Sequence, residues 1–349
     1  MTETSNLLSL IALFSGLPIG IIFGYLIERR EFCSATAITG FLFFRESKHF
    51  KILFVAIAME TLFFFLLSAS ECIPCLPGDF SFILTPVGGL LFGVGMIMGA
   101  GCASGTCYKT GEGNVHSAIV LAFFGLTGYV LTRSPQVSAI LSDIQKHTSI
   151  NKQSNPTLPS ITGIPELVFV LAILFTLVLF IEVRMWQNRE ALLKTSLREQ
   201  LQKWKASWWM TASILGLLGT VAFFLSSSTG RKAGLSISSG IINDIGSLVD
   251  VMLGGKLVFG WGGLFVVGAV TGAFVSSKQT DQFKITGIRV KTAVRGSIGG
   301  VFMGTGVVLT GNCNIGHLFN GIPFFTVSSI TALLFIFLGS VVTVKLMER

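Results

Sequence analysis

Two short runs of the sequence place a cysteine among glycines and small polar residues: Gly101-Cys102-Ala103-Ser104-Gly105 and Gly311-Asn312-Cys313-Asn314-Ile315-Gly316-His317. Glycines let backbone N–H groups approach an anion closely, and a following helix N-terminus adds positive potential. A thiol supplies a weak S–H donor and a soft, polarizable sulfur. The runs therefore predict a binding site for a soft anion, with two small cysteines packed into tight turns as the alternative.

An internal repeat relates the two runs. Gly88-Gly89-x-x-x-Gly93-x-Gly95 matches Gly299-Gly300-x-x-x-Gly304-x-Gly306, and the same ungapped register pairs Cys102 with Cys313 and Gly105 with Gly316. A weaker echo pairs Arg29-Arg30-x-x-x-Ser34 with Arg231-Lys232-x-x-x-Ser236. The repeat predicts two related halves that bring the two runs together near the midplane of a membrane.

Other residues could also carry chemistry. Cys33 follows the first apolar span near its cytoplasmic end, where a thiol would extend a path inward, and packing is the alternative. Cys72-Ile73-Pro74-Cys75 is a Cys-x-x-Cys pair, suited to disulfide exchange or to a structural disulfide. Glu60 lies in the middle of an apolar span, where an acid suggests proton coupling or a hydrogen-bonded helix contact. His317 could line the path or cap a helix.

The composition requires a membrane protein. The chain is 51% hydrophobic and 12% charged with a mean hydropathy of +0.75, whereas charged residues make up about a quarter of a soluble domain. Its 40 glycines suit close packing between membrane helices. No cysteine spacing matches a zinc site and no Gly-x-x-x-x-Gly-Lys motif is present, so we expect no metal, no cofactor and no enzyme activity.

Apolar runs predict an all-α membrane protein with about nine transmembrane helices. The expected spans are Leu7–Ile27, Ile52–Ser70, Phe82–Ala100, Val115–Thr132, Glu166–Val183, Trp209–Ser226, Val258–Val275, Gly296–Thr310 and Phe324–Met347. Phe32–Phe44 and Ile241–Met252 are too short to span, and we expect them to be re-entrant or interfacial segments. We divide the chain into an N-terminal half (1–164), a linker helix with a basic loop (165–208) and a C-terminal half (209–349). An odd linker helix inverts the second half relative to the first, which gives two inverted pseudo-symmetric halves.

Basic residues set the expected orientation, because cytoplasmic loops are enriched in Lys and Arg. They gather in three loops, with Arg29, Arg30, Arg45, Lys48 and Lys51 in the first, Arg184, Arg189, Lys194, Arg198, Lys203 and Lys205 in the second, and Lys278, Lys284, Arg289, Lys291 and Arg295 in the third. The N-terminus is then outside, the polar stretch Ser134–Gly163 is outside, and the C-terminus is cytoplasmic. This rule explains the net charge of +8 without a nucleic-acid partner.

At these residues the chain resembles the YeeE/YedE family, bacterial membrane proteins whose characterised members take up thiosulfate. The matching pieces are Arg30 to Ala35, the glycine-rich run into Gly101–Gly105, and Gly311 to His317. The resemblance implies an inner-membrane pore along which the anion passes by hydrogen bonds to the thiols of Cys33, Cys102 and Cys313. The remaining residues of the expected substrate site are Gly101, Ser104, Gly105, Asn312, Gly316 and His317. A small cytosolic sulfur-carrier protein is a candidate partner.

One departure from the family bears on the substrate. The thiosulfate transporters use a further cysteine in the second half, whereas this chain has none between Cys107 and Cys313 and carries Leu235-Ser236 at the position echoing Cys33. Another sulfur or selenium anion is therefore an alternative substrate. A membrane-embedded thiol oxidoreductase using Cys72 and Cys75, and a passive anion channel, are the alternative functions.

Overall fold

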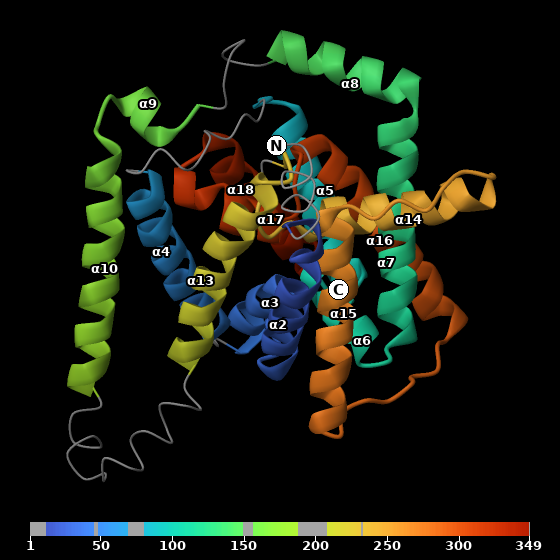
Figure 1. Ribbon diagram of the computed structural model, residues 1–349, viewed down its shortest axis with the longest axis horizontal. Helices are drawn as coiled ribbons and strands as arrows, with labels where there is room; N and C mark the ends of the chain where they lie inside the picture. Colours follow the sequence, from blue (N-terminus) through green and yellow to red (C-terminus); the bar gives the residue numbers. More distant parts are fainter. Residues whose placement is uncertain are drawn as a thin grey trace, which may run out of the picture.

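The computed structural model describes residues 12–44, 48–68, 80–148, 156–187, 208–231 and 233–348, and within these ranges every regular element is a helix. The helices are α2 (Gly16–Arg29), α3 (Ser34–Phe44), α4 (Lys48–Ser68), α5 (Leu84–Met98), α6 (Ala103–Gly111), α7 (Val115–Arg133), α8 (Pro135–Thr148), α9 (Leu158–Thr162), α10 (Glu166–Gln187), α13 (Trp208–Ser227), α14 (Ile237–Met252), α15 (Trp261–Gln279), α16 (Val290–Thr310), α17 (Asn314–Asn320), η1 (Ile322–Phe324) and α18 (Val327–Met347) (Figure 1). The all-helical expectation is confirmed.

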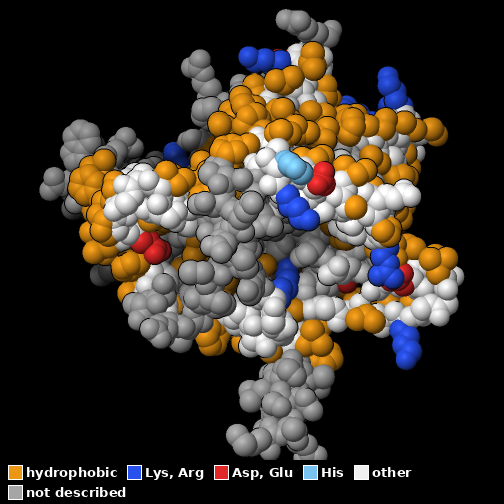
Figure 2. All heavy atoms as spheres, turned by 90° about the horizontal axis from the view of Figure 1, so that it is seen from above, with side chains coloured by type: hydrophobic (Ala, Val, Ile, Leu, Met, Phe, Trp, Pro, Cys, Tyr) orange, Lys and Arg blue, Asp and Glu red, His pale blue; other side chains and the backbone are white. Residues whose placement is uncertain are grey.

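Seven helical segments within the described ranges are long and apolar enough to cross a membrane: Ala12–Gly40, His49–Leu67, Leu84–Gly111, Val115–Arg133, Met210–Ser227, Val290–Asn320 and Val327–Met347. Large apolar side chains also cover the outside of the molecule, with Phe175 69% and Leu334 55% exposed. Figure 2 shows hydrophobic side chains over much of the visible face. The chain is therefore a multi-pass membrane protein. The remaining expected spans coincide with α10 and α15, so a total of nine stays a prediction.

The helices of the two halves pack in matching pairs. The first long helix of each half lies against the third of the other, α2 on α15 and α13 on α4. The glycine-rich helices α5 and α16 pack on each other, and α5 packs on α18 as α16 packs on α7. The α5–α18 and α16–α7 pairings occupy equivalent positions in the sequence repeat. In each case the partner helix, α7 or α18, comes after the short helix that follows a repeated cysteine.

Glycines permit the closest of these approaches. A side chain at Gly88 would meet the Gly306 carbonyl at 2.8 Å, and one at Gly306 would meet the Gly88 carbonyl at 2.7 Å. Gly95 and Gly299 oppose each other's backbones in the same way, at 2.6 and 2.9 Å. In lipid the helices gain nothing from hydrophobic association, so backbone-to-backbone packing is the main attraction available to them. The repeated glycines are thus the surface on which α5 and α16 meet.

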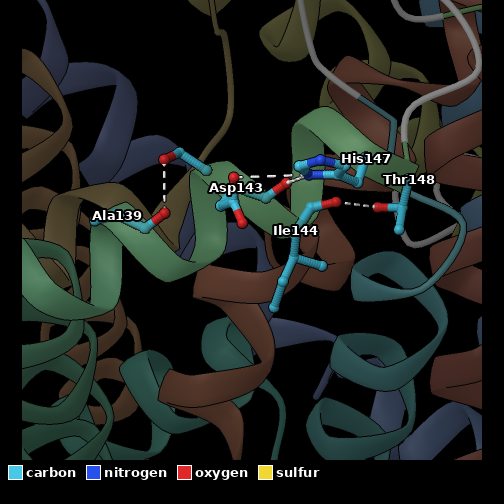
Figure 3. Close-up of polar contacts among 6 residues, drawn as sticks. Ala139, Asp143, Ile144, His147 and Thr148 are labelled. Carbon is cyan, nitrogen blue, oxygen red and sulfur yellow. Dashed lines mark hydrogen bonds and ion pairs between the residues drawn. The ribbon is translucent and has the colours of Figure 1, made fainter.

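The polar stretch Ser134–Gly163, expected outside the membrane, contains α8 and α9. In Figure 1, α8 lies across the end of α7. Along α8, the Ser142 and Thr148 hydroxyls donate to the Ala139 and Ile144 carbonyls, and Asp143 lies 3.6 Å from His147 (Figure 3). Side chains one turn apart thus interact along this polar surface helix.

The α2–α15 crossing generates a stability prediction. A Cβ at Gly24 would overlap the Ala269 carbonyl, which is backbone and cannot move aside. We expect Gly24→Ala to lower the free energy of unfolding by about 1–3 kcal/mol, the usual cost of overpacking. Thermal unfolding of the detergent-solubilised protein measures this. Gly287→Ala, at a glycine with open space around its Cβ position, is the control, and equal melting of the two variants would contradict the prediction.

Candidate functional site

Two thiols meet in the core. Cys33, in the turn between α2 and α3, places its Sγ 3.2 Å from the Sγ of Cys102, in the break between α5 and α6. The backbone N–H of Cys102 donates to Cys33 Sγ at 3.3 Å, and the Ser104 hydroxyl lies 3.2 Å from Cys102 Sγ. Both cysteines are fully buried. The structure therefore brings together residues that are 69 positions apart in sequence.

The α5–α6 break exposes backbone N–H groups at this thiol pair. Ala100 adopts a positive φ of 54°, and Cys102 is the N-cap of α6. The N–H of Gly105 points back to Cys102 Sγ at 3.4 Å. Gly105 must be glycine here, because a Cβ would overlap Cys33 Sγ. The Cys33 thiol, the Ser104 hydroxyl and the Gly105 N–H thus all contact the Cys102 thiol at the N-terminus of α6. A helix N-terminus is a favourable environment for negative charge.

The α16–α17 break is built in a related way. Gly311 ends α16 with φ +83°, and Cys313 is the N-cap of α17. The Thr310 hydroxyl donates to the Asn312 carbonyl at 2.8 Å, and the Asn312 side chain occupies the space that a Cβ at Gly316 would need. The Cys313 thiol is fully buried within hydrogen-bonding reach of Ser238 and of the Gly316 backbone.

A hydrogen bond joins the two breaks. Asn314, directly after Cys313, donates through Nδ2 to the hydroxyl of Ser34, directly after Cys33. The three cysteine-bearing turns are therefore linked through the Cys33 turn, which contacts Cys102 by its thiol and Asn314 by the hydroxyl of Ser34. Sequence analysis missed Ser34 and Asn314 as functional residues, although each lies next to a predicted cysteine. Ser238 gave no sequence signal.

The other predicted site residues lie around this centre. Gly101 closes the end of α5 by donating its N–H to the Met96 carbonyl at 3.0 Å. His317 Nδ1 lies 3.0 Å from the Ser329 hydroxyl of α18, and its buried Nε2 has no hydrogen-bond partner in the part of the chain that is described. His317 therefore fastens α17 to α18 and does not cap a helix.

Cys33 is fully enclosed by the protein. The sequence placed it after the first apolar span, near the expected cytoplasmic end, and in the structure its thiol lies against that of Cys102. The reason is the turn after α2, where Glu31 takes φ 49° and the Phe32 N–H donates back to the Ile27 carbonyl at 2.8 Å. This turn directs Cys33 inward.

Glu60 is also fully buried, and its carboxyl lies against Gly219 where α4 crosses α13. Neither carboxyl oxygen has a hydrogen-bond partner among the described residues, so Glu60 contacts α13 by packing alone. Cys72 and Cys75 lie outside the described residues.

The thiols are closed off from solvent in this conformation. A cavity of about 520 Å³ opens instead between α6, α7 and α15, with a mainly apolar lining that includes Val115, Phe274 and Phe283. Its lining contains none of the cysteines. Passage of an ion between the thiols would therefore need the three turns to separate. Within the described ranges, no cluster of His, Cys, Asp or Glu could hold a metal ion.

Three glutamates, Glu28, Glu31 and Glu112, form an acidic cluster near the Cys33 turn. The Glu28 carboxyl is buried without a hydrogen-bond partner in the described ranges. Glu112, at the end of α6, lies near it, and burial together with the Glu28 charge raises the pKa of Glu112 to about 7. Glu31 adds to this rise and Lys109 opposes it. Glu112 is therefore half-protonated near neutral pH.

Comparisons with known proteins relate this chain to transport proteins. The family described as sulphur transport matches residues 29–342. A thiosulfate transporter TsuA from Spirochaeta thermophila is 32% identical over 343 residues, which cover 94% of this chain and 97% of that protein. A thiosulfate transporter TsuA from Escherichia coli is 30% identical over 312 residues, covering 87% of this chain and 86% of that protein.

The raised pKa of Glu112 predicts a pH-dependent stability. A free glutamate titrates near about 4.3, so folding favours the protonated form, and the stability from this group is complete below that pH and lost as pH rises through about 7. We expect the melting temperature to fall between about pH 5 and about pH 8, and Glu112→Gln to reduce that fall. Glu348→Gln, at an exposed helix end, should leave it unchanged; identical pH profiles for all three proteins would contradict this account.

Proposed function

This chain belongs to the sulphur transport family, and from that premise we propose that it takes up thiosulfate or a related small sulfur-containing anion across a bacterial inner membrane. The observation that carries the proposal is the meeting of Cys33 and Cys102 at 3.2 Å, with the Cys313 turn joined to theirs through Asn314 and Ser34. Buried thiols concentrated at two helix breaks are a setting for binding an anion. The relatives' printed names supply the substrate class.

The proposed path runs between the thiols. An anion at Cys102 would receive S–H donors from Cys33 and Cys102, the Ser104 hydroxyl and the Gly105 N–H, groups that now bond one another. Exchanging these internal bonds for bonds to the ion keeps every donor paired, so a small separation of the turns is sufficient. Cys313, with the Gly316 backbone beside it, provides the next position. Gly101, Asn312 and His317 hold the two breaks in place.

We propose the same two inverted halves for the whole chain, with the boundaries 1–164, 165–208 and 209–349. The paired helix contacts support this arrangement, because α2 on α15 corresponds to α13 on α4, and the Gly88–Gly306 contact corresponds to the Gly95–Gly299 contact. α10 is then the linker helix, and α3 and α14 are the re-entrant segments. The nine spans and the external N-terminus with a cytoplasmic C-terminus belong to this proposal.

The chain acts in this proposal as a transporter and not as an enzyme. A small cytosolic sulfur-carrier protein remains the candidate partner that would receive the imported sulfur. The lipid bilayer is its other partner, and no nucleic acid is involved.

Loss of a central thiol should stop uptake. A hydrogen bond to a charged ligand contributes about 1.5–3 kcal/mol, so Cys102→Ala and Cys313→Ala should lower uptake of labelled thiosulfate by about ten- to a hundred-fold. Cys33→Ala should be nearly as severe, because its thiol shares the Cys102 contact. Cys107→Ala is the matched control, a fully buried cysteine elsewhere on α6. Full growth on thiosulfate by the Cys102 and Cys313 variants, at normal membrane levels, would leave these thiols as packing residues.

Thiol donors should also set selectivity. The terminal sulfur of thiosulfate is soft and weakly hydrated, whereas sulfate presents only hard, strongly hydrated oxygens to a weak S–H donor. Unlabelled thiosulfate should compete fully for uptake, and sulfate only weakly. Competition assays in whole cells measure this, and equal competition by sulfate would remove the case for thiol selectivity.

A further inference from the structure

Arg231, in the loop between α13 and α14, is half-buried, and no described carboxylate lies within ion-pair distance of its guanidinium. Its Nη2 donates to the Ser239 hydroxyl at 2.7 Å and to the Ser236 carbonyl at 3.3 Å, while the guanidinium lies over the Trp261 ring at 5.3 Å. Its Nη1 is buried and has no hydrogen-bond partner among the described residues. The His147–Asp143 contact is the only ion pair within the described ranges, so no described carboxylate neutralises Arg231.

Leaving this charge uncompensated is costly, because a buried ion that loses its hydration needs a partner of opposite sign. Burial lowers the pKa of Arg231 only to about 10, so the group stays charged at neutral pH. The nearest acid on α14 is Asp244, whose carboxyl lies against the backbone of Gly263 on α15. Its Oδ1 is also without a hydrogen-bond partner in the described part of the chain, so the two groups do not satisfy each other.

The helix ends around Arg231 add to its positive potential. A Cβ at Gly262 would lie 3.1 Å from Arg231 Nη1, so the guanidinium rests on the first turn of α15, and it bonds to the first turn of α14 through Ser239. The N-caps, Ser236 and Gly260, make no side-chain capping bond within the described residues. Helix N-termini favour negative charge and disfavour a cation. The guanidinium and the two helix N-termini therefore favour an anion at this position, and the Asp244 carboxyl is the one nearby described group that opposes it.

Hydrogen bonds connect Arg231 to the second cysteine loop. Arg231 donates to Ser239, whose hydroxyl lies 3.2 Å from that of Ser236. The Ser236 hydroxyl donates to the Asn312 side chain at 3.2 Å, and Asn312 directly precedes Cys313. An ion held at Arg231 would thus lie beside the loop that carries the Cys313 thiol.

We propose that Arg231, with the first turns of α14 and α15, forms a binding site for a small divalent oxyanion, which holds the ion before it reaches the thiols. This inference rests on the proposed function. A guanidinium binds two oxygens of one anion, so it recognises the charge and the spacing of the oxygens and does not distinguish a sulfur atom from an oxygen elsewhere on the anion. The site therefore accepts sulfate as well as thiosulfate, and discrimination between them falls to the thiols.

The repeat supplies a matched control. Arg29, at the position echoing Arg231, is exposed and donates to the Tyr25 hydroxyl at 2.7 Å and to Gln279 at 3.1 Å. Its guanidinium is satisfied at the surface, away from the cysteine loops. Arg29→Gln thus removes the arginine at the equivalent position of the repeat, and this arginine is exposed.

Trp261 provides a direct reporter, because its ring faces the guanidinium. In a variant with Trp186, Trp204, Trp208 and Trp209 changed to Phe, the remaining Trp261 fluorescence of the purified protein is titrated with sodium sulfate or thiosulfate, with chloride at matched ionic strength as the blank. We expect a saturable change with either anion. Arg231→Gln should weaken the apparent affinity about ten-fold or more, and Arg29→Gln should preserve it. Equal titrations with and without Arg231 would overturn the proposal.

Thermal unfolding separates binding from a structural role. An arginine that only fastens the α13–α14 loop predicts that Arg231→Gln melts lower in chloride buffer. The anion site predicts instead that the variant melts no lower, since an unpaired buried charge is gone, and that sulfate raises the melting temperature of the parent but not of the variant. A lower melting temperature in chloride, together with full stabilisation by sulfate, would overturn the proposal. Arg231→Lys, which keeps the charge without the planar fork, should retain weakened sulfate stabilisation.

Uptake into proteoliposomes distinguishes this site from the transport function. Saturable sulfate binding at Arg231 in a protein that moves no thiosulfate would uphold the site and overturn the proposed transport. In a transporting protein, Arg231→Gln should raise the KM for thiosulfate with little change in maximal rate, whereas Cys102→Ala should abolish uptake and leave the Trp261 titration intact. Unchanged uptake kinetics in Arg231→Gln would overturn the role of the site in transport.

Discussion

A helix interrupted inside a membrane leaves backbone N–H and C=O groups that lipid cannot hydrogen-bond, and this constraint shapes the centre of the molecule. At the α5–α6 break, the Ala100 carbonyl accepts from Lys109 Nζ at 2.7 Å, and the Gly105 N–H turns to the Cys102 thiol. At the α16–α17 break, the Thr310 hydroxyl donates a hydrogen bond to the Asn312 carbonyl. The Gly105 N–H and the Cys102 thiol, which bond each other at the first break, are also proposed to hold the anion, so the stability of this break and the binding of the ion use the same donors.

Close helix packing makes these breaks possible. The reciprocal glycine contacts between α5 and α16 hold the two interrupted helices backbone to backbone, which keeps their breaks away from lipid. The same closeness explains why the three thiols are fully buried in this conformation. A rigid glycine framework with short polar turns inside it suits a path that opens by small movements of the turns, because the long helices can stay in contact while side-chain hydrogen bonds exchange.

The charges around the thiols differ between the Cys33 turn and the Cys313 loop. The buried Glu28 precedes the Cys33 turn and Glu112 lies near Glu28, while the Cys313 loop is connected through Ser236 and Ser239 to Arg231, which has no ion-pair partner among the described residues. A cation near one cysteine loop and acids near the other give an approaching anion unequal surroundings at the two ends of the proposed path. Parts of the chain with matching helix contacts therefore differ in their electrostatic potential, which acts on an ion at long range.

The sequence by itself determined the membrane class, the all-helical architecture and most helix bounds to within a few residues, because hydropathy is a local property of the chain. It did not give the burial of Cys33 against Cys102, the Asn314–Ser34 bond, or the helices α8 and α9. It also could not tell half-buried Arg231 from exposed Arg29, although the two occupy echoing positions. These features depend on where the backbone turns and on which helix packs against each residue. Both are decided by how helices that are distant in sequence cross each other, which local sequence patterns do not specify.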